Sequence, residues 1–191
     1  MKRIGLFGGS FDPVHLGHEQ MAHEVLKCGI DSLIIMPCKV SPHKLDNQPK
    51  ASDSHRMKML QAVFGDDPRF VLSDYELKLS EVSYTWKTLE YLNSLYPDVR
   101  FALVIGYDQY LKLSHWVNFN QWSQPVDFFV FKRKVETSVP CILDINVEFV
   151  DFEPMAISST KIREMFQSKD PNVSEFVSKS VLEVCKKTYC H

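Results

Sequence analysis

The stretch "GLFGGSFDPVHLGH", residues 5–18, decides the expected fold. A short apolar run at 3–7, "RIGLF", leads into its paired glycines. A helical pattern then covers 16–29, and a second continuous apolar run, "SLIIMP", follows at 32–37. Strand, glycine turn, helix and strand in this order form a βαβ unit, and the two strands of such a unit are parallel.

Helical patterns and extended apolar runs continue to alternate along the rest of the chain. The further expected helices cover 54–65, 84–97, 108–116, 118–124, 158–168 and 174–187. The further expected extended runs are 69–77, 100–106, 127–133 and 146–152. This alternation predicts an α/β fold with a doubly wound, mostly parallel Rossmann-like sheet and helices on both faces. A length of 191 residues fits a single domain over 1–191, with the C-terminal helices 158–187 packed on it.

The composition excludes several classes of protein. The formal net charge of −2 provides no general electrostatic attraction for nucleic acid. No apolar run approaches the ~20 residues that a membrane-spanning helix needs, and "MKRIGLFGG" is too short for a signal peptide, so we expect a cytoplasmic protein. Reduced thiols are then expected for the five cysteines. Cys185, Cys190 and His191 are interpreted as a frayed terminus in preference to part of a metal site.

The first candidate site is "GGSFDPVHLGH", because ligands of doubly wound sheets bind beyond the carboxyl ends of the strands. The spacing of Gly5, Gly8, Gly9 and Gly17 does not match the dinucleotide pattern G-x-G-x-x-G, which argues against an oxidoreductase. The P-loop pattern also fails, since no Lys-Ser or Lys-Thr pair follows.

Zinc binding and phosphate binding remain as alternatives for this stretch. His15 and His18 are three residues apart, but no convincing third zinc ligand accompanies them. A phosphate cradle explains more of the pattern. Gly8 and Gly9 allow a ligand to approach the backbone, and the start of the following helix attracts anions. The two histidines would act as charged donors to phosphate oxygens, with the Ser10 hydroxyl beside them.

The second candidate site is "ISSTKIRE", residues 157–164, at the start of a late helix. Ser158 or Ser159 can cap this helix, and Arg163 is a fixed cation suited to phosphate. Residues 158–161 also satisfy the serine acylase pattern S-x-x-K, but neither S-D-N nor K-T-G accompanies it. A capped surface helix with an exposed arginine is the plain alternative.

Both stretches resemble a known superfamily. "GGSFDPVHLGH" resembles the H-x-G-H signature of the nucleotidylyltransferases, and "ISSTKIR" resembles their second signature, I-S-S-T-x-I-R. Within it, the segments 41–44, 82–92 and 106–116 resemble the bacterial nicotinate mononucleotide adenylyltransferases. The resemblance extends from Ile4 to the helix after Arg163.

The resemblance implies transfer of AMP from ATP to nicotinate mononucleotide by direct attack of the substrate phosphate on the α-phosphate. Deamido-NAD and pyrophosphate are the products, and Mg²⁺ is held by phosphates and water and by no protein side chain. The implied catalytic residues are His15, His18 and Arg163. The implied ATP-binding residues are Gly8, Gly9, Ser10, Phe11, His15, His18, Gly106, Asp108, Ser158, Ser159, Thr160 and Arg163.

The resemblance also implies a second substrate site. Its expected mononucleotide-binding residues are Ser10, Lys44, Tyr84, Thr85 and Trp116. The Trp116 indole can stack on a pyridine ring, and the Thr85 hydroxyl with nearby amides can receive a carboxylate. Asp108 suits ribose hydroxyls. Each of these residues also has an explanation without a ligand. Trp116 could be a core residue, Asp108 a helix cap and Lys44 a solvated loop residue.

The sequence leaves several alternative functions open. The nearest is the same reaction on nicotinamide mononucleotide, or on both mononucleotides, since the two bases differ by one charge. Pantetheine-phosphate adenylyltransferase and a catalytically inactive nucleotide-binding regulator are the others. A homo-oligomer stays open as well.

Overall fold

The fold is built on one parallel sheet. The computed structural model describes residues 2–42, 48–80, 82–119, 122, 126–132, 145–152, 155 and 157–190. The six strands are β1 (Lys2–Gly9), β2 (Ser32–Pro37), β3 (Phe70–Leu72), β4 (Val99–Gly106), β5 (Asp127–Lys132) and β6 (Val147–Asp151). Their order is β3-β2-β1-β4-β5-β6, and all neighbouring pairs are parallel. The prediction of a doubly wound α/β sheet is therefore confirmed.

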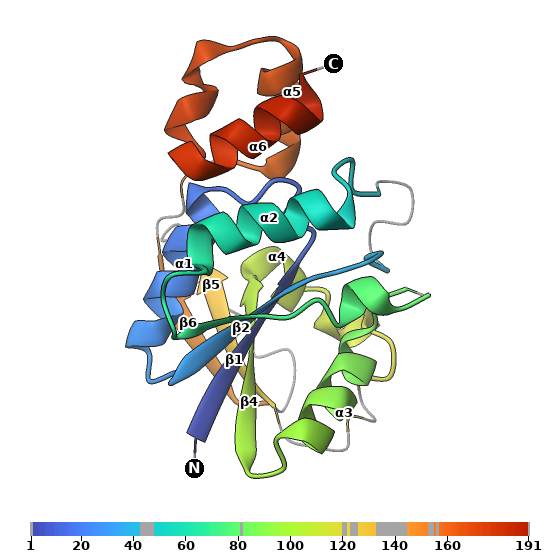
Figure 1. Ribbon diagram of the computed structural model, residues 1–191. Helices are drawn as coiled ribbons and strands as arrows, with labels where there is room; N and C mark the ends of the chain where they lie inside the picture. Colours follow the sequence, from blue (N-terminus) through green and yellow to red (C-terminus); the bar gives the residue numbers. More distant parts are fainter. Residues whose placement is uncertain are drawn as a thin grey trace.

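Helices cover both faces of this sheet (Figure 1). They are α1 (Leu16–Lys27), α2 (Asp53–Phe64), α3 (Thr85–Leu95), the short α4 (Tyr107–Tyr110), α5 (Ser159–Gln167) and α6 (Lys179–Tyr189). Three 3₁₀ segments among the described residues are η1 (Glu76–Lys78), η2 (Leu113–His115) and η4 (Pro171–Glu175). The carboxyl ends of the strands point toward the end of the molecule that α5 and α6 cover (Figure 1).

Side-chain alternation along the strands divides the core in two. Phe7, Leu33 and Phe129 pack with α1, α2, α5 and α6 in one cluster. Their strand neighbours Leu6 and Ile34 pack with α3 and η2 in the other. The chain adds β2 and β3 on one side of β1, and then returns to add β4, β5 and β6 on the other side. A cleft forms at the carboxyl ends of β1 and β4, because the connections from these two strands lead away in opposite directions.

Three expected elements differ from the observed ones. The extended run 69–77 is only the short strand β3, because the amides of Leu77 and Lys78 bond the Asp74 carbonyl and start η1. The helix 108–116 is α4 followed by η2. The helix 174–187 is η4, which the Asp170 side chain caps, followed by α6. The expected helix 118–124 lies partly outside the described residues.

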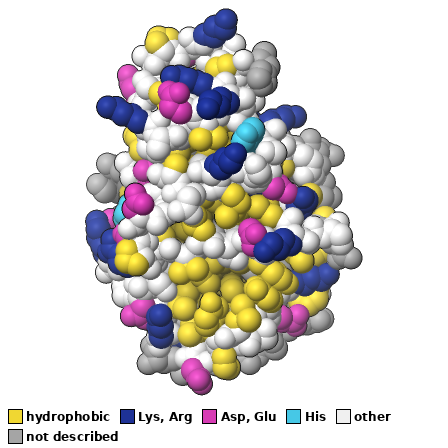
Figure 2. Space-filling view, viewed as in Figure 1, with side chains coloured by type: hydrophobic (Ala, Val, Ile, Leu, Met, Phe, Trp, Pro, Cys, Tyr) yellow, Lys and Arg dark blue, Asp and Glu magenta, His cyan; other side chains and the backbone are white. Residues whose placement is uncertain are grey.

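The C-terminal helices belong to the core. In Figure 2 lysine and arginine side chains stand out on their outer surface, while hydrophobic side chains gather over the strands below.

The expectation of a frayed terminus is wrong up to Tyr189, which ends α6 and is buried. Burial raises the pKa of the Cys185 thiol to about 12, and its sulfur lies 3.6 Å from that of Met59. His191 lies outside the described residues. Within the described part of the chain no helix has the length and apolar character to cross a membrane.

Candidate active site

The first signature places two imidazole rings at the start of α1. His15 is the N-cap of this helix, and its ring lies 3.7 Å from the ring of His18, centroid to centroid. The His15 backbone N–H donates to Nδ1 of His18 at 3.3 Å. Because Nδ1 is the acceptor in this bond, the ring proton of neutral His18 resides on Nε2. His18 is thus prepared to donate a hydrogen bond through Nε2.

His15 differs from expectation in its charge. Only 7% of the residue is exposed, and burial lowers the pKa of its imidazole to about 4. The expectation that both histidines are charged is therefore wrong for His15 in the free protein, because desolvation disfavours the cation. A neutral imidazole still has one N–H to donate. His15 can therefore offer a hydrogen bond to an anion without bringing a positive charge of its own.

Two glycines of the first signature make room for the protein's own rings. A Cβ on Gly9 would lie 3.0 Å from the ring of Phe11, and a Cβ on Gly17 would lie 3.1 Å from the ring of His15. A Cβ on Gly8 would meet nothing within 4 Å. Gly8 therefore has open space beside it where a ligand can approach, whereas the absence of a side chain at Gly9 and Gly17 makes room for the Phe11 and His15 rings.

Phe11 supports the site from beneath. It has a positive φ of 46°, and only 1% of the residue is exposed. Its ring packs edge-on against Phe7 at 5.5 Å and His18 at 5.1 Å. Its side chain therefore holds the His18 ring in place, and it has little surface to offer a ligand.

The second signature has the expected helix start. Ser158 is the N-cap of α5, and its Oγ accepts from the Lys161 amide at 3.2 Å. The Lys161 ammonium lies 3.6 Å from the Glu164 carboxylate. A lysine held by an acid on the surface does not activate the serine, so the arrangement gives no support to a serine nucleophile.

The two signatures are joined although they lie at opposite ends of the chain. The Ser159 hydroxyl donates to the Pro13 carbonyl at 2.9 Å, and Arg163 Nη1 donates to the Asp12 carbonyl at 2.6 Å. Arg163 Nη2 also donates to Thr160 Oγ1 at 3.2 Å. The Arg163 side chain is only 13% exposed, so the alternative of a surface arginine is wrong. The helix starts of α1 and α5 thereby face one cavity.

This first cavity has a volume of about 390 Å³. Most of the residues that we expected to bind ATP line it together: Gly9, Ser10, Phe11, His15, His18, Asp108, Ser158, Ser159, Thr160 and Arg163. Asp108 is not a capping residue, because Gly106 is the N-cap of α4 and no side-chain cap bond forms. The expected ATP residues Gly8 and Gly106 lie elsewhere, on a second cavity.

The second cavity, of about 220 Å³, shares Gly9 and Ser10 with the first. Thr85 and Trp116 line it, as we expected for the mononucleotide. Both also line a small third pocket, together with Tyr84. Trp116 is half-buried beside this space, so it is not a fully enclosed core residue. Lys44 and the neighbouring His43 lie outside the described residues.

One functional neighbour of the site was not anticipated. Arg56 of α2 is completely buried, and its Nη1 donates to the carbonyls of Ser10 at 2.9 Å and Cys38 at 2.7 Å. Its Nη2 pairs with Asp53 at 2.6 Å. The carboxyl ends of β1 and β2 are thus tied to α2. The available signal was a cation on the same helix face as apolar Met59.

A buried acid on the second cavity was also missed. Glu76 of η1 accepts from the Thr88 hydroxyl at 2.6 Å, and burial raises the pKa of its carboxyl. The Ser83 hydroxyl contributes a further hydrogen bond to this carboxyl and accepts from the Lys39 amide at 3.0 Å. Glu76 therefore fastens the segment before α3, the helix whose start carries Thr85. No sequence motif pointed to it.

The first cavity is lined by two carboxylates that could contact a metal ion, those of Asp12 and Asp108. Both oxygens of Asp12 already accept from protein donors, which leaves Asp108 as the acid that faces open space. Within the described part of the chain no group of three or more His, Cys, Asp or Glu could hold a metal ion.

A parallel sheet with two phosphate-suited helix starts on one cavity defines a nucleotide-binding class of protein. The chain belongs to the cytidylyltransferase-like family, whose model matches residues 6–165. Its relatives carry a more particular name. The nicotinate-nucleotide adenylyltransferase of Bacillus subtilis (strain 168) is 37% identical over 175 residues, which covers 90% of this chain and 89% of that protein. The probable nicotinate-nucleotide adenylyltransferase of Clostridium novyi (strain NT) is 34% identical over 188 residues, covering 93% and 92%.

The fold matches solved structures over nearly its whole length. Plasmodium falciparum nicotinic acid mononucleotide adenylyltransferase complexed with NaAD superposes with a TM-score of 0.83 at 19% identity, covering 98% of this chain and 96% of that one. The same protein complexed with APC superposes with a TM-score of 0.80. The superfamily resemblance and the fold predicted from the sequence are both confirmed.

Proposed function

We propose that this chain transfers AMP from ATP to nicotinate mononucleotide, and thereby forms deamido-NAD and pyrophosphate for NAD biosynthesis. The observation that carries the proposal is the pair of cavities that meet at Gly9 and Ser10. One is lined by both signature helix starts, and the other by Thr85 and Trp116. The names of the curated relatives support the same activity.

The first cavity is assigned to the triphosphate of ATP. The α-phosphate lies near Gly9, where His18 Nε2–H and neutral His15 donate to its oxygens. Arg163 and the first-turn amides of α5 hold the β- and γ-phosphates and stabilise the departing pyrophosphate. Asp108, at the mouth of the same cavity, receives ribose hydroxyls. Mg²⁺ enters as part of the MgATP substrate and neutralises phosphate charge.

The second cavity is assigned to the mononucleotide. The pyridine carboxylate lies at the start of α3, where the helix dipole and the Thr85 hydroxyl favour a negative group. The Trp116 indole stacks on the pyridine ring, which adds about 0.5–1.5 kcal/mol beyond simple burial. Tyr84 is the N-cap of α3 and borders the same pocket. The mononucleotide phosphate then points to Ser10, toward the ATP.

The reaction takes place where the two cavities meet, and it requires alignment of the two phosphates more than proton transfer. A phosphate oxygen of the mononucleotide attacks the α-phosphorus of ATP, the new P–O bond forms, and the bond to the β-phosphate oxygen breaks. The attacking oxygen is already ionised near neutral pH, so no general base is required. The protein aligns the two phosphates and stabilises the charge that develops on the α-phosphate and the pyrophosphate.

The direct test measures pyrophosphate release by the purified protein with ATP and either nicotinate or nicotinamide mononucleotide, with and without Mg²⁺. We expect rapid, Mg²⁺-dependent release with nicotinate mononucleotide and formation of the dinucleotide. The variant His18→Ala, prepared in the same way, controls for contaminating activity. A higher kcat/KM with nicotinamide mononucleotide would overturn the substrate assignment, and release with neither would overturn the reaction.

A further inference from the structure

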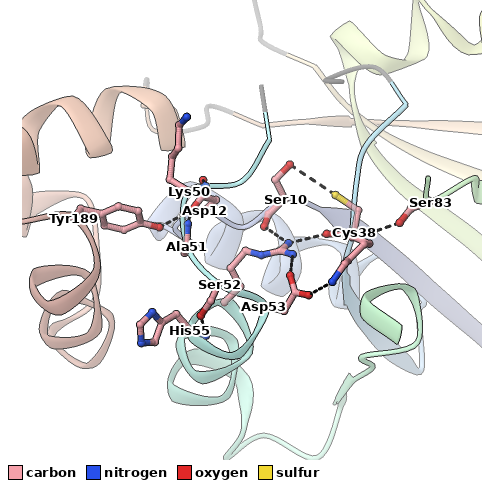
Figure 3. Close-up of polar contacts among 12 residues, drawn as sticks. Ser10, Asp12, Cys38, Lys50, Ala51, Ser52, Asp53, His55, Ser83 and Tyr189 are labelled. Carbon is pink, nitrogen blue, oxygen red and sulfur yellow. Dashed lines mark hydrogen bonds and ion pairs between the residues drawn. The ribbon is translucent and has the colours of Figure 1, made fainter. Parts of the chain in front are cut away.

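Asp12, inside the first signature, is a buried carboxylate with partners from three separate segments. Only 2% of the residue is exposed. Its Oδ2 accepts from the Lys50 amide at 2.8 Å, and its Oδ1 accepts from the Ala51 amide at 2.9 Å. The Tyr189 hydroxyl donates to Oδ1 at 2.6 Å (Figure 3). Arg163 Nη1 lies 3.3 Å from Oδ2.

The position of this carboxylate is unusual for a phosphate site. Asp12 lines the same cavity as His15, His18 and Arg163. A negative group there opposes a triphosphate unless donors surround it, because like charges repel strongly where water is excluded. The carboxylate therefore needs its partners, and Arg163 is held in place by both the side chain and the carbonyl of Asp12.

Tyr189 is the partner that comes from furthest along the chain. It is the last residue of α6, it is 7% exposed, and its ring packs against Phe166 of α5 at 5.8 Å. Figure 3 shows its hydroxyl reaching Asp12 from the side opposite Ser10. Burial, together with the adjacent carboxylate, raises the pKa of the phenol, so the hydroxyl stays protonated and donates.

We propose that Tyr189 is a positioning residue of the active site: its hydroxyl fixes the Asp12 carboxylate, which in turn sets the guanidinium of Arg163 for the phosphates of ATP. The C-terminal helix is then part of the ATP site without touching the nucleotide. This inference rests on the proposed function, which assigns the first cavity to the triphosphate of ATP.

The test compares Tyr189→Phe with a matched control on the same helix turn. Tyr189→Phe removes only the hydroxyl and keeps the ring in its packing. The control Thr188→Val removes a hydroxyl that bonds the Val184 carbonyl at 2.9 Å and lies 3.3 Å from His55 Nδ1, and that does not bond Asp12. We expect Tyr189→Phe to raise the KM for ATP about fivefold to tenfold, because Asp12 then has one donor fewer and holds the Arg163 guanidinium less firmly, so that only part of the lost hydrogen bond affects ATP. The KM for the mononucleotide should change little, whereas the Tm should fall by a few degrees because a buried hydrogen bond to a carboxylate is lost.

Equilibrium binding of a non-hydrolysable ATP analogue is measured on the same proteins. This second measurement separates the two proposals, because it does not require turnover. A parent protein that binds the analogue but forms no dinucleotide would overturn the proposed function and leave the Tyr189 effect measurable. Analogue binding by Tyr189→Phe within twofold of the parent's would overturn the positioning role, as would an equal loss in Thr188→Val.

A double-mutant cycle with Asp12→Asn tests whether Tyr189 acts through Asp12. Asp12→Asn removes the ion pair with Arg163 and sets a carboxamide among amide donors, so it should by itself weaken ATP binding. The double variant should bind ATP no more weakly than Asp12→Asn alone. Fully additive losses would show that Tyr189 acts by another route, and normal ATP binding by Asp12→Asn would overturn the inference even if Tyr189→Phe failed to fold.

Discussion

Replacing Gly17 by alanine should separate the activity of this protein from its stability. Gly17 is the second residue of α1, and alanine is favoured over glycine in helices by up to about 1 kcal/mol. The new Cβ, however, would lie 3.1 Å from both Cε1 and Nδ1 of the His15 ring. That approach is tighter than ordinary van der Waals contact, so the ring must move by a few tenths of an ångström.

The His15 ring can shift toward the His18 ring or into the first cavity, which it lines, and either movement takes it from the position where it would meet a phosphate. The His18 ring lies 3.7 Å away and itself packs on Phe11. A shift of His15 toward it would also displace His18, the proposed donor to the α-phosphate. A misplacement of about 1 Å costs about 100-fold in rate, so a few tenths of an ångström should lower kcat/KM by about fourfold to tenfold. Thermal unfolding should be unchanged or occur at a slightly higher temperature.

The assay is pyrophosphate release under subsaturating substrates, with a thermal unfolding curve for each protein. Gln20→Ala, at an exposed position of the same helix, is the control for helix propensity alone and should keep full activity. A Gly17→Ala protein with kcat/KM within twofold of the parent's would refute the reasoning, because the His15 ring would then have room. A large fall in Tm would also refute it, since the loss would reflect misfolding.

Three further outcomes test the assigned residues. His18→Ala should lower kcat by about 10²–10³-fold, the usual effect of losing one preorganised donor; near-normal turnover in the pyrophosphate assay would remove it from the mechanism. Trp116→Ala should raise the KM for the mononucleotide about threefold to tenfold through lost stacking, and an equal rise in the KM for ATP would count against the assignment. His15 should make the protein acid-sensitive: its pKa falls from 6.5 in the unfolded chain to about 4 in the folded one, so between these pH values only the unfolded chain binds the proton. The free energy of unfolding should therefore drop by up to about 3 kcal/mol as pH falls from 6.5 to 4, with no contribution above 6.5. In urea unfolding at several pH values, His15→Asn should show a shallower drop, and identical slopes would contradict the buried neutral ring.

Local patterns were sufficient for the order of the main strands and helices and for proposing where the candidate site lies. The run at 3–7, the glycines and the run at 32–37 each determine their structure from near neighbours, and β1, α1 and β2 follow directly. The carboxyl end of a parallel strand next to a helix start is then an anion site on geometric grounds. Cytoplasmic location and the lack of nucleic-acid binding stay predictions from the sequence.

Boundaries set by local hydrogen bonds were harder to predict. Two of the three misjudged elements, η1 and η4, follow an aspartate: the Asp74 backbone carbonyl accepts at the start of η1, and the Asp170 carboxylate accepts at the start of η4. Aspartate serves equally well in loops and at caps, so local sequence does not separate these outcomes.

The amino-acid sequence alone determined the alternation of strands and helices that predicts a parallel sheet, the two signature helix starts and the chemistry that they suit, because each strand and helix start is specified by residues close together in the chain. Only the tertiary structure decided which groups surround one another. It buried His15 and so removed its charge, assigned Gly9 and Gly17 to internal packing, and placed Arg56 beneath the strand ends. It also brought Tyr189 to Asp12, a contact between residues 177 positions apart. Charge and position in a site depend on burial and on distant neighbours, and these exist only once the chain has folded.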